Sequence, residues 1–138
     1  MIYTGEISLK TRGDSEIIDI TAKVQKHLIE SGITSGTITV FVTHSTCGIT
    51  TVEYEPGLIE DLGKAWERLA PKNIPYGHDA RWGDGNGYAH VRASLLGASL
   101  TVPFTDKTLV LGTWQQIIVV DFDNRPRSRT VVVQVMGE

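Results

Sequence analysis

The stretch Trp114–Phe122 constrains the fold most, because it is apolar on both of its faces. Four consecutive apolar residues, Ile117 to Val120, lie within it. A strand with apolar side chains on both sides must be covered on both sides. We therefore predict a central strand here, with other elements packed against each face.

The other strands follow from alternating apolar residues. Ile38, Val40 and Val42 share one face of the strand Thr37–His44, and His44 falls on that face at its end. The dipeptide Asp106-Lys107 predicts a hairpin turn. The remaining predicted strands are a short one around Ile7 and Leu9, then Glu16–Ile18, Ile49–Tyr54, Ser99–Phe104, Thr108–Leu111 and Ser128–Met136.

Three helices are predicted from helical spacing and end signals. The first follows Asp19, a candidate cap, and ends at Gly32; the second runs from Pro56 to Pro71; the third runs from Gly87 to Leu96. Residues 73–87 form the longest irregular segment. Strands and helices are grouped instead of alternating, which favours an α+β fold in a single domain over residues 1–138.

Composition narrows the function classes. The net charge of −3 argues against a protein that coats nucleic acid, and no apolar run is long enough to span a bilayer. The single cysteine, Cys47, excludes an intrachain disulfide, and the start MIYTGEISLK lacks the pattern of a secretory signal. We expect a cytoplasmic protein without a membrane or nucleic-acid partner.

Histidines are the first candidates for chemistry. His44 ends a strand, His78 lies in the irregular segment, and His90 lies on a helix with Ser94 one turn later. Neutral imidazoles bind zinc-like ions, so His44, His78 and His90 could share a divalent metal. The alternative is that each is a hydrogen-bonded structural residue, and spacing alone does not separate the two.

Arginines are the second candidates. Arg125, Arg127 and Arg129 recur at every second position and continue onto the face of the valines that follow. Guanidinium groups suit phosphate and carboxylate, so these residues could bind an anion. The alternative is a solvated turn with salt bridges to Asp121 and Asp123.

The polar run Thr43–Gly48 joins two predicted strands and could hold an anion with its hydroxyl and backbone N–H groups. Cys47 follows His44 by three residues, which raises the possibility of a nucleophile pair. No protease signature surrounds the two residues, so a buried, unreactive cysteine is the better interpretation.

Four segments together resemble the YjbQ-like family, also called the secondary thiamine-phosphate synthase enzymes. They are HSTCGITTVEYEPGLIEDL from His44, YGHDARWGDGNGYAHVRASLLGASLTVPF from Tyr76, LGTWQQI from Leu111 and PRSRTVVV from Pro126. The resemblance implies a compact, largely antiparallel sheet packed with about three helices and assembled as a homotrimer. It also implies a site at His44, Glu53, His78, Asn86, His90, Ser94, Gln115, Arg127 and Arg129.

The first hypothesis is an enzyme acting on phosphorylated or pyrophosphorylated metabolites, with the weak thiamine-phosphate synthase activity that the resemblance implies. His44, His78 and His90 would hold a divalent metal, and His44 and Glu53 would be catalytic. The substrate would be bound by Asn86, Ser94, Gln115, Arg127 and Arg129. The alternatives are a metal-dependent hydrolase and a non-catalytic, trimeric protein that binds a metal or a metabolite.

Overall fold

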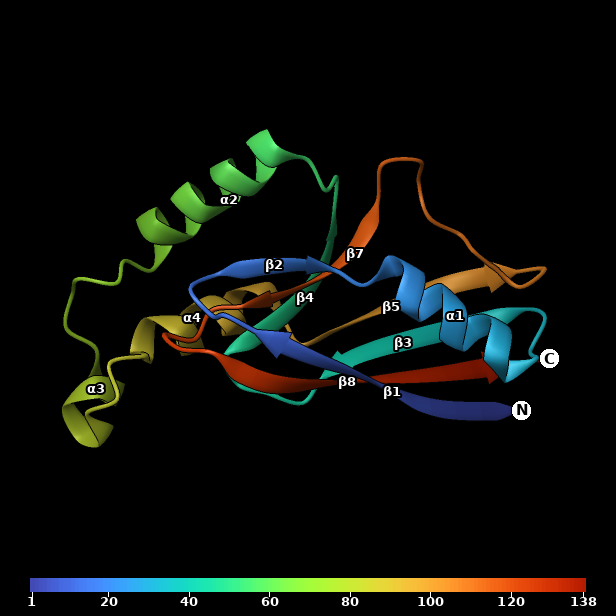
Figure 1. The fold of residues 1–138 in the computed structure, drawn as a ribbon, viewed down its shortest axis with the longest axis horizontal. Coiled ribbons are helices and arrows are strands. Elements are labelled where there is room, and N and C mark those ends of the chain that lie inside the picture. Colours follow the sequence, from blue (N-terminus) through green and yellow to red (C-terminus); the bar gives the residue numbers. More distant parts are fainter.

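The computed structural model describes residues 1–138 as two antiparallel sheets with helices packed against them (Figure 1). The larger sheet has the strand order β1-β8-β3-β5-β6 and the smaller one β2-β7-β4. The strands are β1 (Ile2–Thr11), β2 (Glu16–Asp19), β3 (Gly36–Val42), β4 (Cys47–Val52), β5 (Ser99–Thr105), β6 (Thr108–Leu109), β7 (Gln116–Asp121) and β8 (Arg127–Gly137). The helices are α1 (Thr21–Ser31), α2 (Pro56–Leu69), α3 (Gly77–Trp82) and α4 (Gly87–Leu96). The predicted α+β fold is confirmed, with one helix more than expected.

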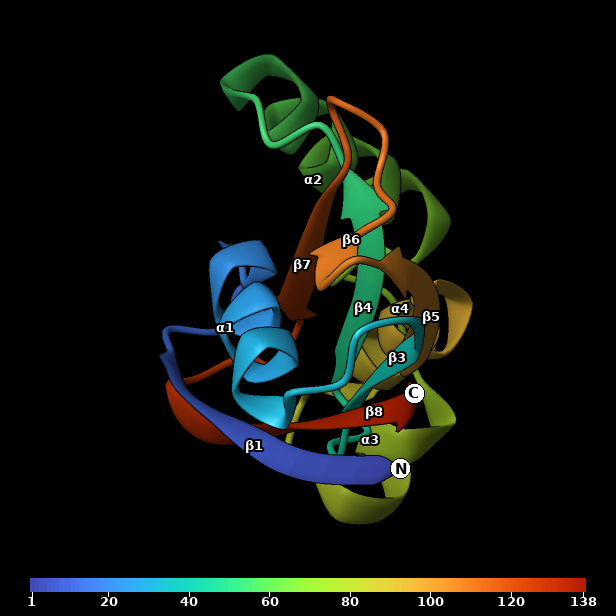
Figure 2. The ribbon, with the colours of Figure 1, turned by 90° about the vertical axis from the view of Figure 1, so that its right-hand side faces the viewer.

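Strand β7 is central and buried on both faces, as its sequence predicts. Ile117 and Val119 belong to a core shared with the larger sheet and α1. Ile118 and Val120 belong to a second core, which α2 and α4 close from the other side. Figure 2 shows the resulting layers, with α2 above the smaller sheet and β1 and β8 below it.

The second core explains how the helices are held. Trp66 of α2 meets Phe122 edge-on, with ring centroids 4.8 Å apart. α4 approaches β4 closely because Gly48 has no side chain; a Cβ there would lie 2.6 Å from a methyl carbon of Leu96. This close approach places the C-terminal end of α4 beside the start of β4.

The predicted hairpin turn is confirmed by the backbone, and the cap position of α1 is Ile20, one residue after the predicted Asp19. Asp106 and Lys107 join β5 to β6 with φ values of 50° and 59°. Two consecutive positive φ angles define the tight hairpin turn that matches strand twist. Asp19 accepts hydrogen bonds from the backbone and the hydroxyl of Thr21, the first residue of α1, at 2.9 and 2.7 Å.

Several predicted boundaries are wrong, including that of β4, which covers Cys47–Val52 instead of Ile49–Tyr54. β3 ends at Val42, so His44 lies in the turn to β4, where the chain crosses from one sheet to the other. β7 begins at Gln116, because a turn closed by Gln115 N donating to Gly112 O precedes it. The segment 73–87, predicted to be irregular, contains α3, whose Asp79 accepts from Gly87 N at the start of α4.

None of the helices is both long enough and apolar enough to cross a membrane.

Candidate functional site

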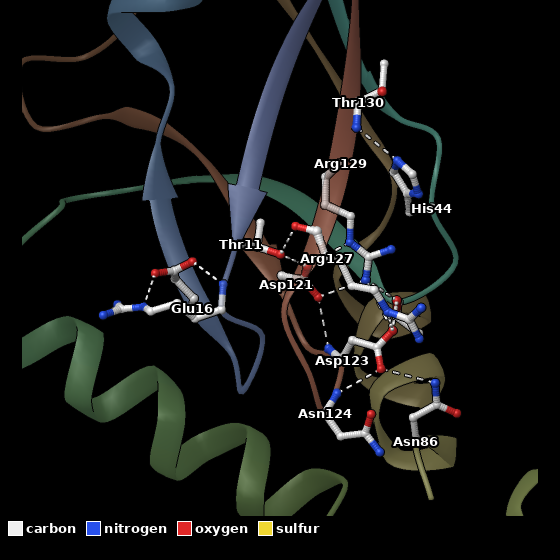
Figure 3. A network of polar contacts seen from close by, with 12 residues as sticks. Thr11, Glu16, His44, Asn86, Asp121, Asp123, Asn124, Arg127, Arg129 and Thr130 are labelled. Atoms are coloured by element: carbon white, nitrogen blue, oxygen red, sulfur yellow. Dashed lines mark hydrogen bonds and ion pairs between the residues drawn. The ribbon is translucent and has the colours of Figure 1, made fainter. Parts of the chain in front are cut away.

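A polar cavity of about 340 Å³ opens where the β3–β4 turn, the start of α4 and the β7–β8 connection meet. The segments come from three distant parts of the sequence, and antiparallel pairing brings their ends to one edge of the fold (Figure 3). None of the lining residues is apolar, which is unusual for a small-molecule site. The lining consists of Thr43, His44, Ser45, Thr46, Asn86, His90, Asp123, Arg127 and Arg129.

A buried network of two carboxylates and one guanidinium forms the floor of this cavity. Arg129 Nε donates to Asp121 Oδ2 at 2.7 Å, and Arg129 Nη2 donates to Asp121 Oδ1 at 3.0 Å. The same Nη2 lies 3.3 Å from Asp123 Oδ2 and 2.7 Å from the hydroxyl oxygen of Thr46. The hydroxyl of Thr11 donates to Asp121 as well. Together these contacts join β1, β7, β8 and the β3–β4 turn.

Both carboxylates are ionised at neutral pH. Burial by itself would raise the pKa of Asp121, but hydrogen bonds from Arg129 and Thr11 bring it below its ordinary value. Burial also opposes ionisation of Asp123, and the backbone N–H of Asn124 and the side chain of Asn86 outweigh it and lower that pKa. The charge of Arg129 is therefore balanced inside the protein.

The two arginines that line the cavity differ in what they can bind. Arg129 is buried, and its Nε and Nη2 are engaged by protein groups. Arg127 is only partly buried and donates through Nε alone, to Asp123 Oδ2 at 3.2 Å. Its two terminal nitrogens have no partner within the chain. Arg127 thus offers two terminal nitrogens to an anion, whereas Arg129 organises the floor and keeps only Nη1 without a partner.

His44 is held as a neutral hydrogen-bond donor. The backbone N–H of Thr130 donates to His44 Nε2 at 2.9 Å (Figure 3). That contact occupies the lone pair of Nε2 and leaves the ring proton on Nδ1. Burial and the positive charge of Arg129 both lower the pKa of His44. The neutral tautomer with a donating Nδ1 is therefore the stable form at neutral pH.

His90 is the second imidazole of the cavity, and His78 lies against it. The two ring centroids are 4.4 Å apart, with an interplanar angle of 39°. Burial, followed by the interaction with His78, lowers the pKa of His90. Neither ring nitrogen of His90 has a hydrogen-bond partner in the chain, so the neutral ring offers a lone pair. His90 can accept a proton where His44 can only donate.

Two buried polar atoms near the cavity have no partner, namely Asn86 Oδ1 and His78 Nδ1. The amide of Asn86 is oriented by Asp123, because Asn86 Nδ2 donates to Asp123 Oδ1 at 3.2 Å. A carboxylate accepts only, so the carbonyl oxygen of Asn86 must face away from it. His78 Nδ1 lies 3.6 Å from Asp79 and 3.9 Å from Asp84, outside hydrogen-bond range.

Four of the predicted site residues do not line this cavity: His78, which packs against His90, and Glu53, Gln115 and Ser94. Glu53 follows the far end of β4, about 20 Å along the strand from the cavity edge, and is exposed. Gln115 lines a different cavity, between β4 and β5, and bonds Thr51 and the backbone of Gly112. Ser94 is exposed and donates to the backbone oxygen of His90. Their place in the site was implied by the family resemblance. The fold of a single chain does not bring them to the polar cavity.

The predicted zinc-like site does not fit the donors present. The structure contains no group of three or more His, Cys, Asp or Glu side chains arranged to hold a metal ion. His44 would have to give up the Thr130 contact to ligate through Nε2, or move its proton to ligate through Nδ1. His78 and His90 form a pair, and His44 is not part of it.

Cys47 is buried, and desolvation raises its pKa to about 12, with the charge of Asp121 adding to the shift. A thiol with that pKa carries almost no thiolate at neutral pH. The interpretation of Cys47 as an unreactive core residue agrees with this environment.

Sequence reasoning gave Asp121 as a possible metal ligand or salt-bridge partner, Asp123 as a possible salt-bridge partner and Thr46 as part of the polar run Thr43–Gly48, and it missed Thr11. The signal for the carboxylates was present, because Asp121 and Asp123 show the same two-residue spacing as Arg127 and Arg129. Nothing in the local sequence pointed to Thr11, which lies 110 residues from Asp121.

The fold is that of a small α+β domain with a polar cavity at the edge of its sheets. The chain belongs to the UPF0047, YjbQ-like family, whose model matches residues 5–138. A UPF0047 protein of Methanothermobacter thermautotrophicus is 42% identical over 99% of this chain and 94% of its own length. YugU of Bacillus subtilis is 38% identical over 95% of this chain and 97% of its own.

Solved structures show the same fold. A YbjQ-like protein of unknown function from Sulfolobus solfataricus has a TM-score of 0.95 and 34% identity, covering 100% of this chain and 99% of its own. A YjbQ/UPF0047 protein of Clostridium acetobutylicum has a TM-score of 0.85 and 40% identity, covering 93% and 96%. The names of these proteins carry no activity, so they support the family and the fold without supporting a thiamine-phosphate synthase.

Proposed function

We propose that this protein is an enzyme that transfers protons on a small phosphorylated metabolite bound in the polar cavity. One observation carries the proposal: the cavity holds an arginine with unpaired terminal nitrogens beside two histidines. His44 is held as a hydrogen-bond donor, and His90 has a ring nitrogen free to accept. An anion ligand, a proton donor and a proton acceptor are what such a reaction requires.

The three groups have separate roles. Arg127 binds the phosphate group through its terminal nitrogens, since guanidinium pairs with phosphate in a bidentate manner. His90 accepts a proton from the substrate through its unoccupied ring nitrogen. His44 donates from Nδ1 to the oxygen on which negative charge develops. Arg129 touches no substrate in this scheme and holds Thr46 and the two carboxylates in place.

This assignment differs from the sequence-based hypothesis in its base. Glu53 was expected to be catalytic, and its distance from the cavity argues against that role within one chain. His90 replaces it because it is the cavity imidazole whose accepting nitrogen has no donor within the chain. No step is routed through a divalent metal, since the histidines do not form a ligand set.

The proposal includes the cytoplasmic location expected from the composition and N-terminal sequence, and the homotrimer that the family resemblance implies. Trp82 on α3 and Trp114 before β7 have exposed fractions of 67% and 70%, and exposed tryptophans are common at interfaces. Light scattering at micromolar concentration gives the mass. A monomeric mass at that concentration would refute the trimer and would leave the proposed roles of the cavity residues unchanged.

Binding is tested first, by calorimetric titration of phosphate monoesters into the protein. Arg127→Gln is expected to weaken binding by about tenfold or more, as a lost charge-assisted hydrogen bond does. Arg68→Gln removes the same charge from the exposed surface of α2 and is expected to leave affinity unchanged. Equal affinity in Arg127→Gln and the parent protein would refute the anion site.

Proton transfer is tested separately, by following solvent deuterium entering a panel of phosphate esters by NMR. His90→Gln keeps a polar side chain of similar reach and removes the base. It is expected to bind ligand normally and to abolish exchange. Exchange that persists in His90→Gln at the parent rate contradicts the assignment of the base.

A further inference from the structure

Arg127 stands between two cavities, and only one of them belongs to the site described so far. A second cavity of about 310 Å³ is lined by Asp84, Asn124, Arg125 and Arg127. It is formed by the β7–β8 connection and the loop between α3 and α4. The two cavities therefore share one guanidinium group, and a ligand bound on one side of Arg127 is adjacent to the other.

The second cavity carries donors that the protein does not use. Arg125 forms no hydrogen bond, ion pair or aromatic contact within the chain, and Arg127 offers its two terminal nitrogens. The one carboxylate present, Asp84, makes no ion pair with either arginine; its Oδ1 lies 3.9 Å from His78 Nδ1. Two guanidinium groups face one carboxylate here. Because Arg127 is also paired with Asp123, Arg125 supplies the excess positive charge that suits the cavity to an anion.

The turn that presents Arg125 is braced, unlike an ordinary solvated loop. Asp14 N donates to Asp123 O at 2.6 Å, and Asn124 Nδ2 donates to Asp84 O at 2.8 Å. Gly13 packs so closely beneath the turn that a Cβ would lie 2.7 Å from the backbone oxygen of Arg125. The backbone position of Arg125 is thus set before any ligand arrives, which lowers the entropy lost on binding.

We propose that the second cavity binds a second anionic group of the same ligand. The ligand class is then a small metabolite with two anionic groups, one on each side of Arg127 and the second also contacted by Arg125. This inference rests on the proposed function, because the first anion is the phosphate of the polar cavity. It adds a recognition role for Arg125 and excludes simple monophosphates as the preferred ligands.

The test is a calorimetric comparison of alkyl monophosphonates with bisphosphonates of matched carbon length, in a series of increasing methylene spacers. The parent protein is expected to bind the best bisphosphonate about tenfold or more tightly than its monophosphonate partner. Arg125→Gln is expected to abolish this difference and to leave monophosphonate affinity unchanged. Arg127→Gln is expected to weaken both ligands.

Arg68→Gln is the matched control for general electrostatic attraction, since bisphosphonates carry more charge. If it narrows the difference as much as Arg125→Gln, the second site is overturned. Equal binding of the two ligand classes by the parent protein overturns it too. Failure of the phosphate site in the proposed function gives a different result. In that case neither monophosphonates nor bisphosphonates bind, either to the parent protein or to Arg125→Gln.

Discussion

Replacing Arg129 by leucine should be among the most damaging single changes in this protein. The substitution removes the two Arg129 hydrogen bonds to Asp121 and the contacts to Asp123 and Thr46. Asp121 has no exposed surface and Asp123 only 2%, so both charges would stay buried without their cation. Loss of one partner from a buried ion pair costs about 3–5 kcal/mol of unfolding free energy. That is a large part of the stability of a typical domain.

The pH dependence of Arg129→Leu gives the sharper test. In the parent, the pKa of Asp121 is lowered on folding, so its contribution to stability is present above the unfolded pKa of about 3.9 and is lost as pH falls through the folded pKa. Without Arg129, burial dominates and raises the folded pKa above the unfolded value. The variant then loses stability as pH rises through that raised value. Its deficit relative to the parent should be largest at neutral pH and shrink on acidification.

Urea unfolding followed by tryptophan fluorescence measures both effects, because Trp66 is buried in the second core. Arg12→Gln is the control: Arg12 pairs with Glu16 at 2.6 Å, but its side chain is 85% exposed, so the expected cost is below about 1 kcal/mol. Arg129→Lys keeps the positive charge but lacks the two nitrogens that bond Asp121 together. Its loss of unfolding free energy should fall between those of Arg129→Leu and Arg12→Gln. A cost below about 1 kcal/mol for Arg129→Leu, or a deficit that grows on acidification, would refute the reasoning.

Three further predictions each rest on the surroundings of one residue. Gly13→Ala should lower the unfolding free energy by about 1–3 kcal/mol or more in urea titrations, because Gly13 has φ +78° and a Cβ would meet backbone oxygens; parent-like stability would contradict this. Cys47, with its pKa raised to about 12, should react with a disulfide reagent only after denaturant is added, and rapid native labelling would contradict its burial. NMR titration of His44 should give a pKa below that of a model histidine, since burial and Arg129 both lower it; a higher value would remove the neutral donor from the proposed mechanism.

Much of the fold follows from short-range patterns. The two-sided apolar run of β7, the Asp106-Lys107 hairpin and the end of α1 near Gly32 each depend on residues within a few positions of one another. The predicted ends of the strands were less accurate, because a strand ends where its hydrogen-bonded pairing with a neighbour ends. β3 stops at Val42 since its pairing with β8 runs only from Gly36↔Gly137 to Val42↔Val131.

The candidate site was predictable only in part. The family segments pointed to His44, Asn86, His90, Arg127 and Arg129, and these line one cavity. The same segments also pointed to Glu53 and Gln115, which lie elsewhere in the chain. A motif records which residues occur together, whereas the separation between two ends of a strand depends on how the strand runs through the fold.

The sequence by itself determined which side chains share a face, including Arg127 and Arg129, because the two-residue period of a strand is a local property. Only the tertiary structure decided what those side chains do. Arg129 is neutralised by carboxylates at the end of β7, while Arg127 keeps two nitrogens for a ligand. His44 became a donor because β8 brings Thr130 N–H to its ring from 86 residues away. Hydrogen bonds and burial assign protonation states, and contacts between distant segments of a chain exist only after it has folded.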